Sequence, residues 1–357
     1  METALIDIKK KVDAGLRISE SDAFALLSSN DLLSIGMMAD TVRRRKNGDT
    51  TYYIVNRHIN YTNVCMNGCK FCAFHKKPGD NGYTLSLDVI REKAVEGKAA
   101  GATEFHVVGG LNETLPFSFY IDMLHTLRDV DPSIHIQAFT VVELAFIAEI
   151  AKLPLDETIR LLKEAGLGSV PGGGAEIFHP DVRSALCEKK ISGEEWLAVS
   201  RAVHKAGLHS NATMLFGHIE RKEHIVDHMS RLRSLQDETK GFLSFIPLVF
   251  HSGNTEYTGI RAPTGSELMR MLAVSRIFLD NFPHIKSFWI MLGLKMAQLS
   301  QFFGVDDIDG TVTEEKITHA AGASTPENIS RAELVEMIEG GGFHAVERDT
   351  LYRHIKR

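Results

Sequence analysis

The sequence predicts an α/β protein built as a (β/α)8 barrel of the TIM type. Three observations support this prediction. From about residue 51, short strand-like runs alternate with longer amphipathic stretches, about eight such units follow one another, and no obvious antiparallel strand interrupts them. An open, doubly wound sheet uses the same local pattern and remains the alternative. The length of 357 residues suggests about two domains, but a single barrel can use this much chain.

The first fifty residues have a helical pattern. Ser19 and Asp22 resemble a helix start, and apolar residues follow at helical spacing. Strand-like runs begin after this region, and each is short and rich in apolar residues. The expected strands are 53–61, 104–108, 134–140, 169–172, 210–216, 243–250, 288–292 and, more weakly, 305–311.

Amphipathic stretches separate these strands. The expected helices are 87–100, 117–130, the split pair 142–153 and 156–165, then 193–206, 222–237, 266–281, 295–303 and 331–338. Several end at a glycine, as a left-handed C-cap requires. We therefore expect an N-terminal helical extension over residues 1–50, the barrel over 51–320 and a C-terminal helical extension over 321–357, without a linker between independent domains.

Composition excludes several classes of protein. Hydrophobic residues make up 44% and charged residues 24%, which is typical of a soluble globular chain. The 40 Lys and Arg against 46 Asp and Glu give a net charge of −6, and no polybasic tract occurs, which argues against nucleic acid as the main partner. No signal peptide and no long uncharged apolar run is found, so we expect no membrane span and a cytoplasmic location.

Three of the four cysteines lie close together. Cys65, Cys69 and Cys72 have the spacing C-x3-C-x2-C in a loop just after the first expected strand, whereas Cys187 stands alone. Closely spaced thiolates of this kind hold iron–sulfur clusters. A [4Fe–4S] cluster has four irons, so three ligands would leave one iron open to a substrate or cofactor. Cys187 is a possible fourth ligand, but it falls in a helical run, where a lone cysteine is more often a small buried hydrophobe.

A structural zinc site is the alternative for these thiols. Cys65, Cys69 and Cys72 with His75 could hold one zinc ion, although zinc sites usually use two separated pairs of ligands. Burial of the cysteines as plain core residues fits less well, because Asn63, Asn67, Gly68 and Lys70 make the loop polar. The spacing favours the cluster.

The motif C-x3-C-x-Phe71-C at the end of a first barrel strand resembles the radical S-adenosylmethionine (SAM) superfamily. The resemblance implies a [4Fe–4S] cluster held by Cys65, Cys69 and Cys72. It also implies that SAM occupies the open iron, and that an electron donor such as flavodoxin or ferredoxin reduces the cluster. Phe71 would then lie near the adenine of SAM. The cofactor supplies the difficult chemistry, while the protein positions it and excludes water.

Two further segments fit this resemblance. Gly109 and Gly110 end the second expected strand, where the superfamily binds the methionine amino group of SAM through backbone; a plain turn is the alternative. Glu176 and Arg183 follow the fourth strand and resemble the acid and arginine that hold polar groups of SAM in related barrels. A surface ion pair would explain the same spacing.

Polar residues also follow other expected strands, which is where barrel enzymes keep their chemistry. Glu143 follows the third strand, His218 the fifth and His251 the sixth, and we name these three as candidate catalytic residues. Each such residue taken singly is more often structural or solvated. Asp306, Asp307, Asp309 and Thr311 would complete a polar rim at the eighth strand.

The resemblance extends to one subgroup of the superfamily. Segments 60–65 and 69–74 are similar to the subgroup that contains the menaquinone-pathway enzymes and the deazaflavin synthase subunits. Within it, segments 171–178, 245–248 and 309–317 resemble the aminofutalosine synthase family more than its sibling, the dehypoxanthine futalosine cyclases. The sibling cyclase remains an alternative, and a zinc-stabilised binding protein without enzymatic activity is the third.

The synthase resemblance implies a reaction. The 5′-deoxyadenosyl radical from SAM would add to 3-[(1-carboxyvinyl)oxy]benzoate, with rearrangement and decarboxylation to 6-amino-6-deoxyfutalosine, in menaquinone biosynthesis. SAM would then be a consumed co-substrate. The site must hold the two carboxylates of a small aromatic acid and stay apolar enough to protect radicals. Candidate partners for those carboxylates are His218, His251, Arg183 and Arg57.

Overall fold

The computed structural model describes residues 3–356. Its strands are β1 (Thr50–Ile54), β2 (Asn56–Asn60), β3 (Glu104–Val108), β4 (His135–Ala138), β5 (Ser169–Val170), β6 (His209–Phe216), β7 (Phe242–Val249), β8 (His284–Ile285), β9 (Asp307–Gly310) and β10 (His344–Glu347). Its longer helices before β7 are α1 (Thr3–Asp13), α2 (Glu20–Ser28), α3 (Leu32–Asn47), α4 (Leu87–Ala99), α5 (Phe117–Val130), α6 (Val141–Ala151), α7 (Leu155–Ala165), α8 (Pro180–Cys187), α9 (Gly193–Lys205) and α10 (Lys222–Thr239). After β7 come α11 (Gly265–Phe278), α12 (Trp289–Leu292), α13 (Leu294–Ser300), the 3-10 turn η1 (Gln301–Phe303), α14 (Ile317–Ala320) and α15 (Arg331–Glu339).

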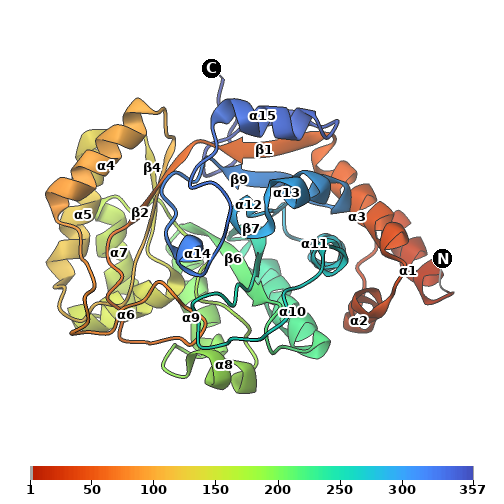
Figure 1. The fold of residues 1–357 in the computed structure, drawn as a ribbon, viewed down its shortest axis with the longest axis horizontal. Helices are drawn as coiled ribbons and strands as arrows, with labels where there is room; N and C mark the ends of the chain where they lie inside the picture. Colours follow the sequence, from red (N-terminus) through yellow and green to blue (C-terminus); the bar gives the residue numbers. More distant parts are fainter. Residues whose placement is uncertain (1–2, 357) are drawn as a thin grey trace.

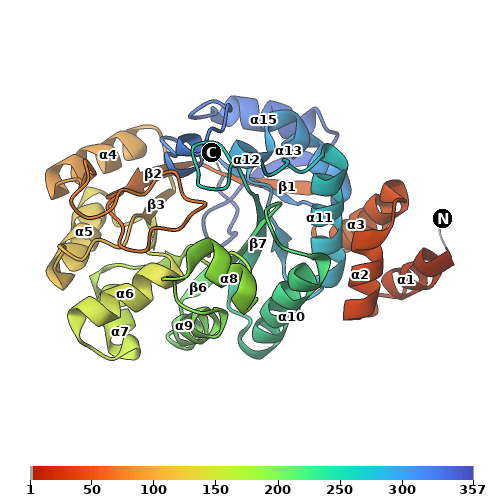
Figure 2. The same ribbon diagram turned by 60° about the horizontal axis from the view of Figure 1, so that its bottom comes forward.

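The strands form a barrel with helices outside it. Strands β2 to β8 lie in chain order in one parallel sheet. The strand β9 segment closes the ring, since Lys286 bridges to Asp307 on one side and Arg57 bridges to Thr313 on the other, both parallel. Figures 1 and 2 show the helices α4 to α11 arranged around these strands. The predicted (β/α)8 barrel is confirmed.

The first expected strand is divided into two. Before Val55, β1 lies outside the barrel sheet and pairs in parallel with β10 and β9; after it, β2 pairs with β3. Strand β10 falls in the region where only helix was expected, so residues 321–356 contain the helix α15 and a strand. The C-terminal segment thus extends a small sheet at the barrel edge.

The expected strand 288–292 is wrong. The chain there forms the short helix α12, and the strand of this unit is the two-residue β8 at His284–Ile285. A short apolar run does not distinguish a buried strand from a buried helical turn. Here Trp289 is fully buried and its indole Nε1 donates to the carbonyl of Gly310 at 2.8 Å, which fixes the helical turn against β9.

The N-terminal helices pack on one side of the barrel. Helix α3 packs against α11, as Figure 2 shows. The guanidinium of Arg43 on α3 is fully buried and donates to the carbonyls of Gly48, Thr50 and Val305. These bonds satisfy backbone groups at the junction between α3 and the small sheet. Helices α1 to α3 lie within the region where the N-terminal extension was expected.

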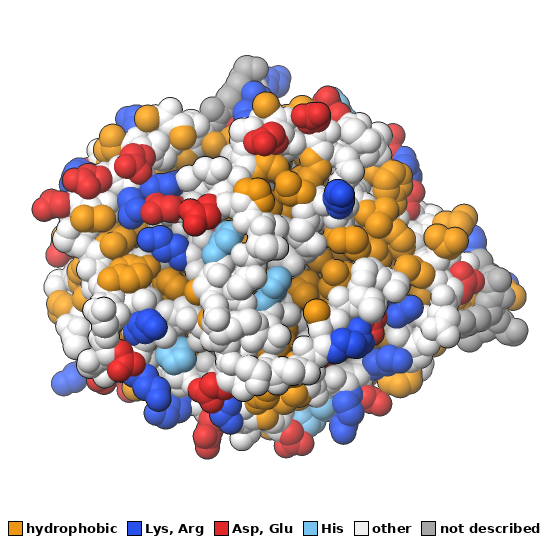
Figure 3. Space-filling model, viewed as in Figure 1, with side chains coloured by type: hydrophobic (Ala, Val, Ile, Leu, Met, Phe, Trp, Pro, Cys, Tyr) orange, Lys and Arg blue, Asp and Glu red, His pale blue; other side chains and the backbone are white. Residues whose placement is uncertain are grey.

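On the face that Figure 3 shows, acidic and basic side chains are interspersed with one another, mainly toward the rim. This agrees with the absence of a polybasic tract in the sequence. Between residues 3 and 356, no helix combines the length and the apolar character needed to cross a membrane.

Candidate functional site

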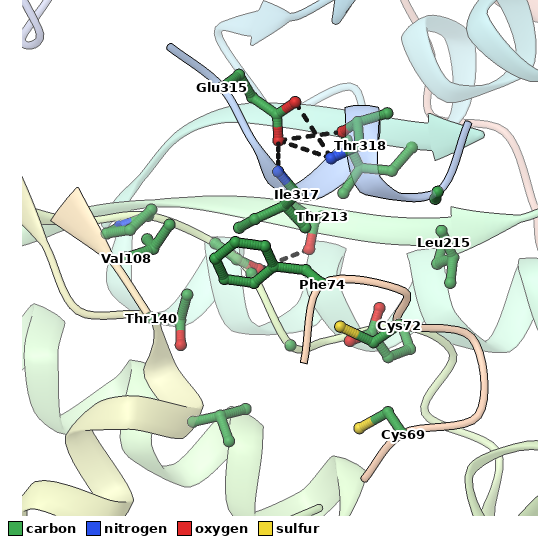
Figure 4. Close-up of a pocket in the computed structure, with 18 of the residues that line it drawn as sticks. Cys69, Cys72, Phe74, Val108, Thr140, Thr213, Leu215, Glu315, Ile317 and Thr318 are labelled. Carbon is green, nitrogen blue, oxygen red and sulfur yellow. Dashed lines mark hydrogen bonds between the residues drawn. The ribbon is translucent and has the colours of Figure 1, made fainter. Parts of the chain in front are cut away.

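A cavity of about 330 Å³ opens at the end of the barrel where the parallel strands finish. Its lining comes from the segments that follow β2, β3, β4, β5, β7, β8 and β9, and from the inner faces of several strands. In a barrel of this type the loops after the strands carry the chemistry. Figure 4 shows Cys69 and Cys72 on one side of this cavity and Glu315 and Thr318 on another.

The thiol loop, residues 63–76, follows β2 and brings three cysteines to the cavity. Cys65, Cys69 and Cys72 all line it, and the sulfur atoms of Cys69 and Cys72 point into it in Figure 4. The loop is fixed by backbone bonds from Cys65 N to the carbonyl of Lys76 at 2.9 Å and from Lys70 N to that of Leu186 at 3.0 Å. Soft thiols on one ordered loop beside an open cavity fit an iron–sulfur cluster.

His75, the fourth ligand of the zinc alternative, lines the cavity together with the three cysteines. Over residues 3–356, no three His, Cys, Asp or Glu side chains are grouped closely enough to hold one metal ion. His75 also has a backbone partner, because its Nδ1 donates to the carbonyl of Cys72 at 2.7 Å.

Cys187 lies beside the thiol loop, although it is distant in sequence. It is buried at the end of α8, and its thiol shares a hydrogen bond with that of Cys69. This bond, together with burial, raises the pKa of Cys69, whereas the same bond lowers the pKa of Cys187 to about 7. Cys187, named from the sequence as a possible fourth ligand, is therefore a neighbour of the predicted cluster ligand Cys69.

The glycine pair after β3 packs against the thiol loop. A Cβ on Gly110 would come within 2.2 Å of the carbonyl oxygen of Val64, and one on Gly109 within 2.7 Å of the Tyr61 ring. Both glycines line the cavity. Their N–H groups are already used, by Glu143 and Thr62 respectively. A ligand amino group is a donor, so the carbonyls remain the groups that could receive it.

Glu143 is fixed by three donors. Its Oε1 accepts from the Tyr61 hydroxyl at 2.8 Å and from Gly109 N at 3.0 Å, and its Oε2 accepts from Thr140 N at 2.8 Å. Burial raises the pKa of Glu143 to about 6, although these three bonds act in the opposite direction. Glu143 lines the cavity, and its bonds hold the ends of β3 and β4 in place.

Glu176 and Arg183, predicted as a pair, have separate partners. Glu176 is buried at the cavity and forms an ion pair with Lys190 at 2.6 Å. Arg183 does not line the cavity; its guanidinium donates to the carbonyls of Ala175 and Ile191. Arg183 therefore braces the loop that presents Glu176 rather than reaching the site itself.

Lys190 takes the position that the sequence suggested for Arg183. Its ammonium lies 5.1 Å from the centre of the Phe71 ring, and both residues line the cavity. Burial alone would lower the pKa of Lys190, but the charges of Cys69 and Glu176 raise it. A cation and an aromatic ring therefore meet beside the thiol loop.

The two candidate histidines differ in position. His251 lines the cavity, and its Nε2 donates to the carbonyl of Met291 at 3.1 Å. The His218 side chain is fully buried outside the cavity lining, and its Nε2 donates to the carbonyl of Leu215 at 2.9 Å. Arg57 also lies outside the lining, where it pairs with Glu96 and Glu314. Because neither His218 nor Arg57 lines the cavity, neither side chain can contact a ligand bound there.

Several lining residues were not foreseen from the sequence. Lys286, Asp309 and His58 contribute charge or hydrogen-bonding groups at the bottom of the cavity, and Glu315 caps α14 above it. Asp309 had been expected only as part of a rim. The sequence contains one signal that identifies His58 as an inward-facing residue. Polar residues alternate along its strand, and inward-facing positions repeat every second residue.

Apolar side chains form much of the remaining wall. Leu215, Ile246, Leu248, Phe288 and Met291 line the cavity between the thiol loop and the polar bottom. An apolar, water-poor wall protects reactive intermediates and strengthens polar contacts inside. The arrangement can therefore hold a flat apolar ligand between two polar ends.

Comparison with known proteins identifies similar families. Residues 59–232 match the model described as the radical SAM superfamily, and residues 239–357 match the CofH/MqnC C-terminal region. The chain is 42% identical to the aminodeoxyfutalosine synthase of Thermus thermophilus, over 99% of this chain and 96% of that protein. It is 38% identical to the 5-amino-6-(D-ribitylamino)uracil–L-tyrosine 4-hydroxyphenyl transferase of Methanopyrus kandleri, over 93% and 92%.

Solved structures agree on the fold. Methylornithine synthase superposes with a TM-score of 0.77 at 15% identity, over 94% of this chain and 96% of that one. The hydrogenase maturase HydG from Carboxydothermus hydrogenoformans gives 0.76 at 17% identity, over 97% and 80%.

Proposed function

The chain belongs to the radical SAM superfamily, within the family that includes the aminodeoxyfutalosine synthases, and from this we propose that it is itself an aminodeoxyfutalosine synthase. It is a transferase-type enzyme, and its family uses a [4Fe–4S] cluster and SAM. The proposed reaction joins the 5′-deoxyadenosyl group of SAM to 3-[(1-carboxyvinyl)oxy]benzoate. Rearrangement and loss of one carboxyl carbon then give 6-amino-6-deoxyfutalosine for menaquinone biosynthesis.

The observation that supports this proposal most is the 42% identity to a synthase over nearly the full length of both chains. The thiols of Cys65, Cys69 and Cys72 would hold the cluster, because they line one cavity from one loop. When bound, the cluster and SAM together supply the 5′-deoxyadenosyl radical. An electron donor of the flavodoxin or ferredoxin type would reduce the cluster.

Residues of this chain would position SAM and the acid. Lys190, beside Phe71 and paired with Glu176, lies where a cation could receive the SAM carboxylate. The carbonyls of Gly109 and Gly110 could receive its amino group. The apolar wall would hold the aromatic ring and exclude water, so that the radical meets the enol ether instead of solvent.

A tyrosine-dependent transferase is the second candidate, because relatives with that name are 38% identical over more than nine tenths of this chain. One experiment separates the candidates. The reconstituted, reduced enzyme is incubated with SAM and either the enol-ether acid or tyrosine with 5-amino-6-(D-ribitylamino)uracil. The synthase proposal predicts an adenosyl-containing product from the acid alone. Free 5′-deoxyadenosine without an adduct would favour the sibling cyclase class.

A further inference from the structure

We propose that Lys286, assisted by His58, binds the ring carboxylate of the aromatic acid at the bottom of the cavity. This inference rests on the proposed function, since it assigns one end of that substrate. It concerns residues on β2 and directly after β8, on the barrel side of the cavity away from the loops.

Cations that can reach a carboxylate in this cavity are few. Among the described residues, Lys190 and Lys286 are the lysines and arginines that line it. Lys190 is paired with Glu176 at 2.6 Å beside the thiol loop, so it belongs to the SAM end. Of the four side chains considered for this role from the sequence, Arg183, Arg57 and His218 lie outside the lining, and His251 lines it but donates its Nε2 to the carbonyl of Met291. Lys286 is the cation left for the acid.

Lys286 lies in a polar arc made by neighbouring strands. Four residues that line the cavity form this arc. Lys286 follows β8, Asp309 lies on β9, and His58 and His106 lie on β2 and β3. The Lys286 side chain is 8% exposed, and its ammonium donates to Asp309 Oδ1 at 3.1 Å. An ammonium has three donors, so this bond leaves capacity for a ligand oxygen.

His58 provides an unused polar atom at the same place. Its Nε2 is buried and has no hydrogen-bond partner in the structure. The His58 ring stacks on that of His106 with centroids 4.4 Å apart and an angle of 16° between the planes, which fixes its direction. A buried polar atom normally has a partner, so an unpaired one on a cavity wall indicates a ligand.

The nearby carboxylate of Glu104 is already compensated. Its Oε2 accepts from the Thr350 hydroxyl at 2.8 Å, and its Oε1 accepts from Asn56 Nδ2 at 3.4 Å. His106, Lys286 and the buried guanidinium of Arg348 also stabilise the charge of this carboxylate. A second carboxylate can therefore approach Lys286 and His58 without facing an uncompensated charge on Glu104.

The shape of the substrate selects which carboxylate binds there. The enol-ether carbon must lie next to the SAM end, and its own carboxylate is attached to that same unit. The ring carboxylate is meta to the ether oxygen on a rigid aromatic ring, so it is held away from the enol-ether unit. Ile246, Leu248 and Phe288 would then contact the ring between the two polar ends.

The test measures binding of two acids to the reconstituted holoenzyme with S-adenosylhomocysteine present, by calorimetry. One ligand is 3-[(1-carboxyvinyl)oxy]benzoate, and the other is the analogue without the ring carboxylate. We expect Lys286→Met to weaken binding of the diacid by about 10- to 100-fold, the usual effect of losing a charged hydrogen bond, and to change binding of the analogue little. Lys286→Arg should retain most of the preference.

Two further variants keep the test independent of folding. His58→Phe keeps the ring stack but removes the nitrogen, and should weaken the diacid alone by about tenfold. Lys93→Met, whose lysine pairs with Glu314 outside the cavity, should change neither affinity. If Lys286→Met and His58→Phe both keep the wild-type preference for the diacid, the inference is wrong but the proposed function stands. If the wild-type enzyme binds neither acid, both are wrong.

Discussion

Tyr61 donates its hydroxyl to Glu143 at 2.8 Å, and the same carboxylate oxygen accepts the backbone N–H of Gly109 at 3.0 Å. This contact joins the end of β2, the glycine pair after β3 and the first turn of α6. The thiol loop begins just beyond Tyr61. Glu143 therefore acts on the predicted SAM site through the backbone that it fixes, and we assign it a positioning role.

Replacing Glu143 with Gln should change how stability depends on pH. The pKa of Glu143 is raised to about 6, so its folded state holds a proton more firmly than its unfolded state. The contribution of this carboxyl group to the free energy of unfolding is complete below about pH 4.5, the pKa of the group in the unfolded chain. It is lost as the pH rises through about 6, a change of about 2 kcal/mol. When the free energy of unfolding is measured with urea between pH 4.5 and 6, it should depend less on pH in Glu143→Gln than in the wild type.

The control for this prediction is Glu149→Gln, on the exposed side of the same helix. It should keep the wild-type pH profile. A Glu143→Gln variant with the same slope as the wild type between pH 4.5 and 6 would contradict the assignment.

Alanine substitutions should separate the cluster ligands from their neighbour. Cys65→Ala, Cys69→Ala or Cys72→Ala should abolish SAM cleavage and lower the iron and sulfide bound after anaerobic reconstitution, because each removes one thiolate. Cys187→Ala should retain iron, sulfide and most SAM cleavage, although its thiol contacts Cys69. Equal iron loss from Cys187→Ala and Cys69→Ala would make Cys187 a ligand.

Loss of Lys190 should destabilise the protein strongly. Lys190→Met would leave the buried carboxylate of Glu176 without its partner at 2.6 Å, which costs about 3–5 kcal/mol in comparable buried pairs. Adding Glu176→Gln should restore much of the free energy of unfolding but not SAM binding. Urea unfolding and SAM titration measure the two effects separately.

An exposed pair provides the comparison. Lys10 and Asp7 form an ion pair at 2.9 Å on the surface of α1, so Lys10→Met should leave the free energy of unfolding nearly unchanged. If Lys190→Met has an equally small effect, the buried pair does not stabilise this loop.

Periodicity and cysteine spacing predicted most of the barrel and the thiol loop, because both depend on residues close in sequence. The errors occurred where distant contacts decide the structure. Trp289 forms a helical turn because it reaches the carbonyl of Gly310, and β10 exists because it pairs with β1. Neither partner is visible from the local pattern.

The same limit applied to the site. Arg183 and Glu176 have a spacing that suggested a pair, yet Arg183 binds backbone carbonyls and Lys190 occupies the position beside Glu176. Lysines such as Lys190 and Lys286 usually lie in solvent, so composition gives no reason to select them. Only the closed barrel shows that they line one cavity.

The fate of the adenosyl carbon tests the central claim most directly. The reduced, reconstituted enzyme is incubated with the enol-ether acid and with SAM labelled with 13C at C5′. The products are separated, and their masses are measured by mass spectrometry. We predict that the label appears in 6-amino-6-deoxyfutalosine, with one carboxyl carbon of the acid released. Label found only in free 5′-deoxyadenosine, with the acid unchanged, would contradict the account.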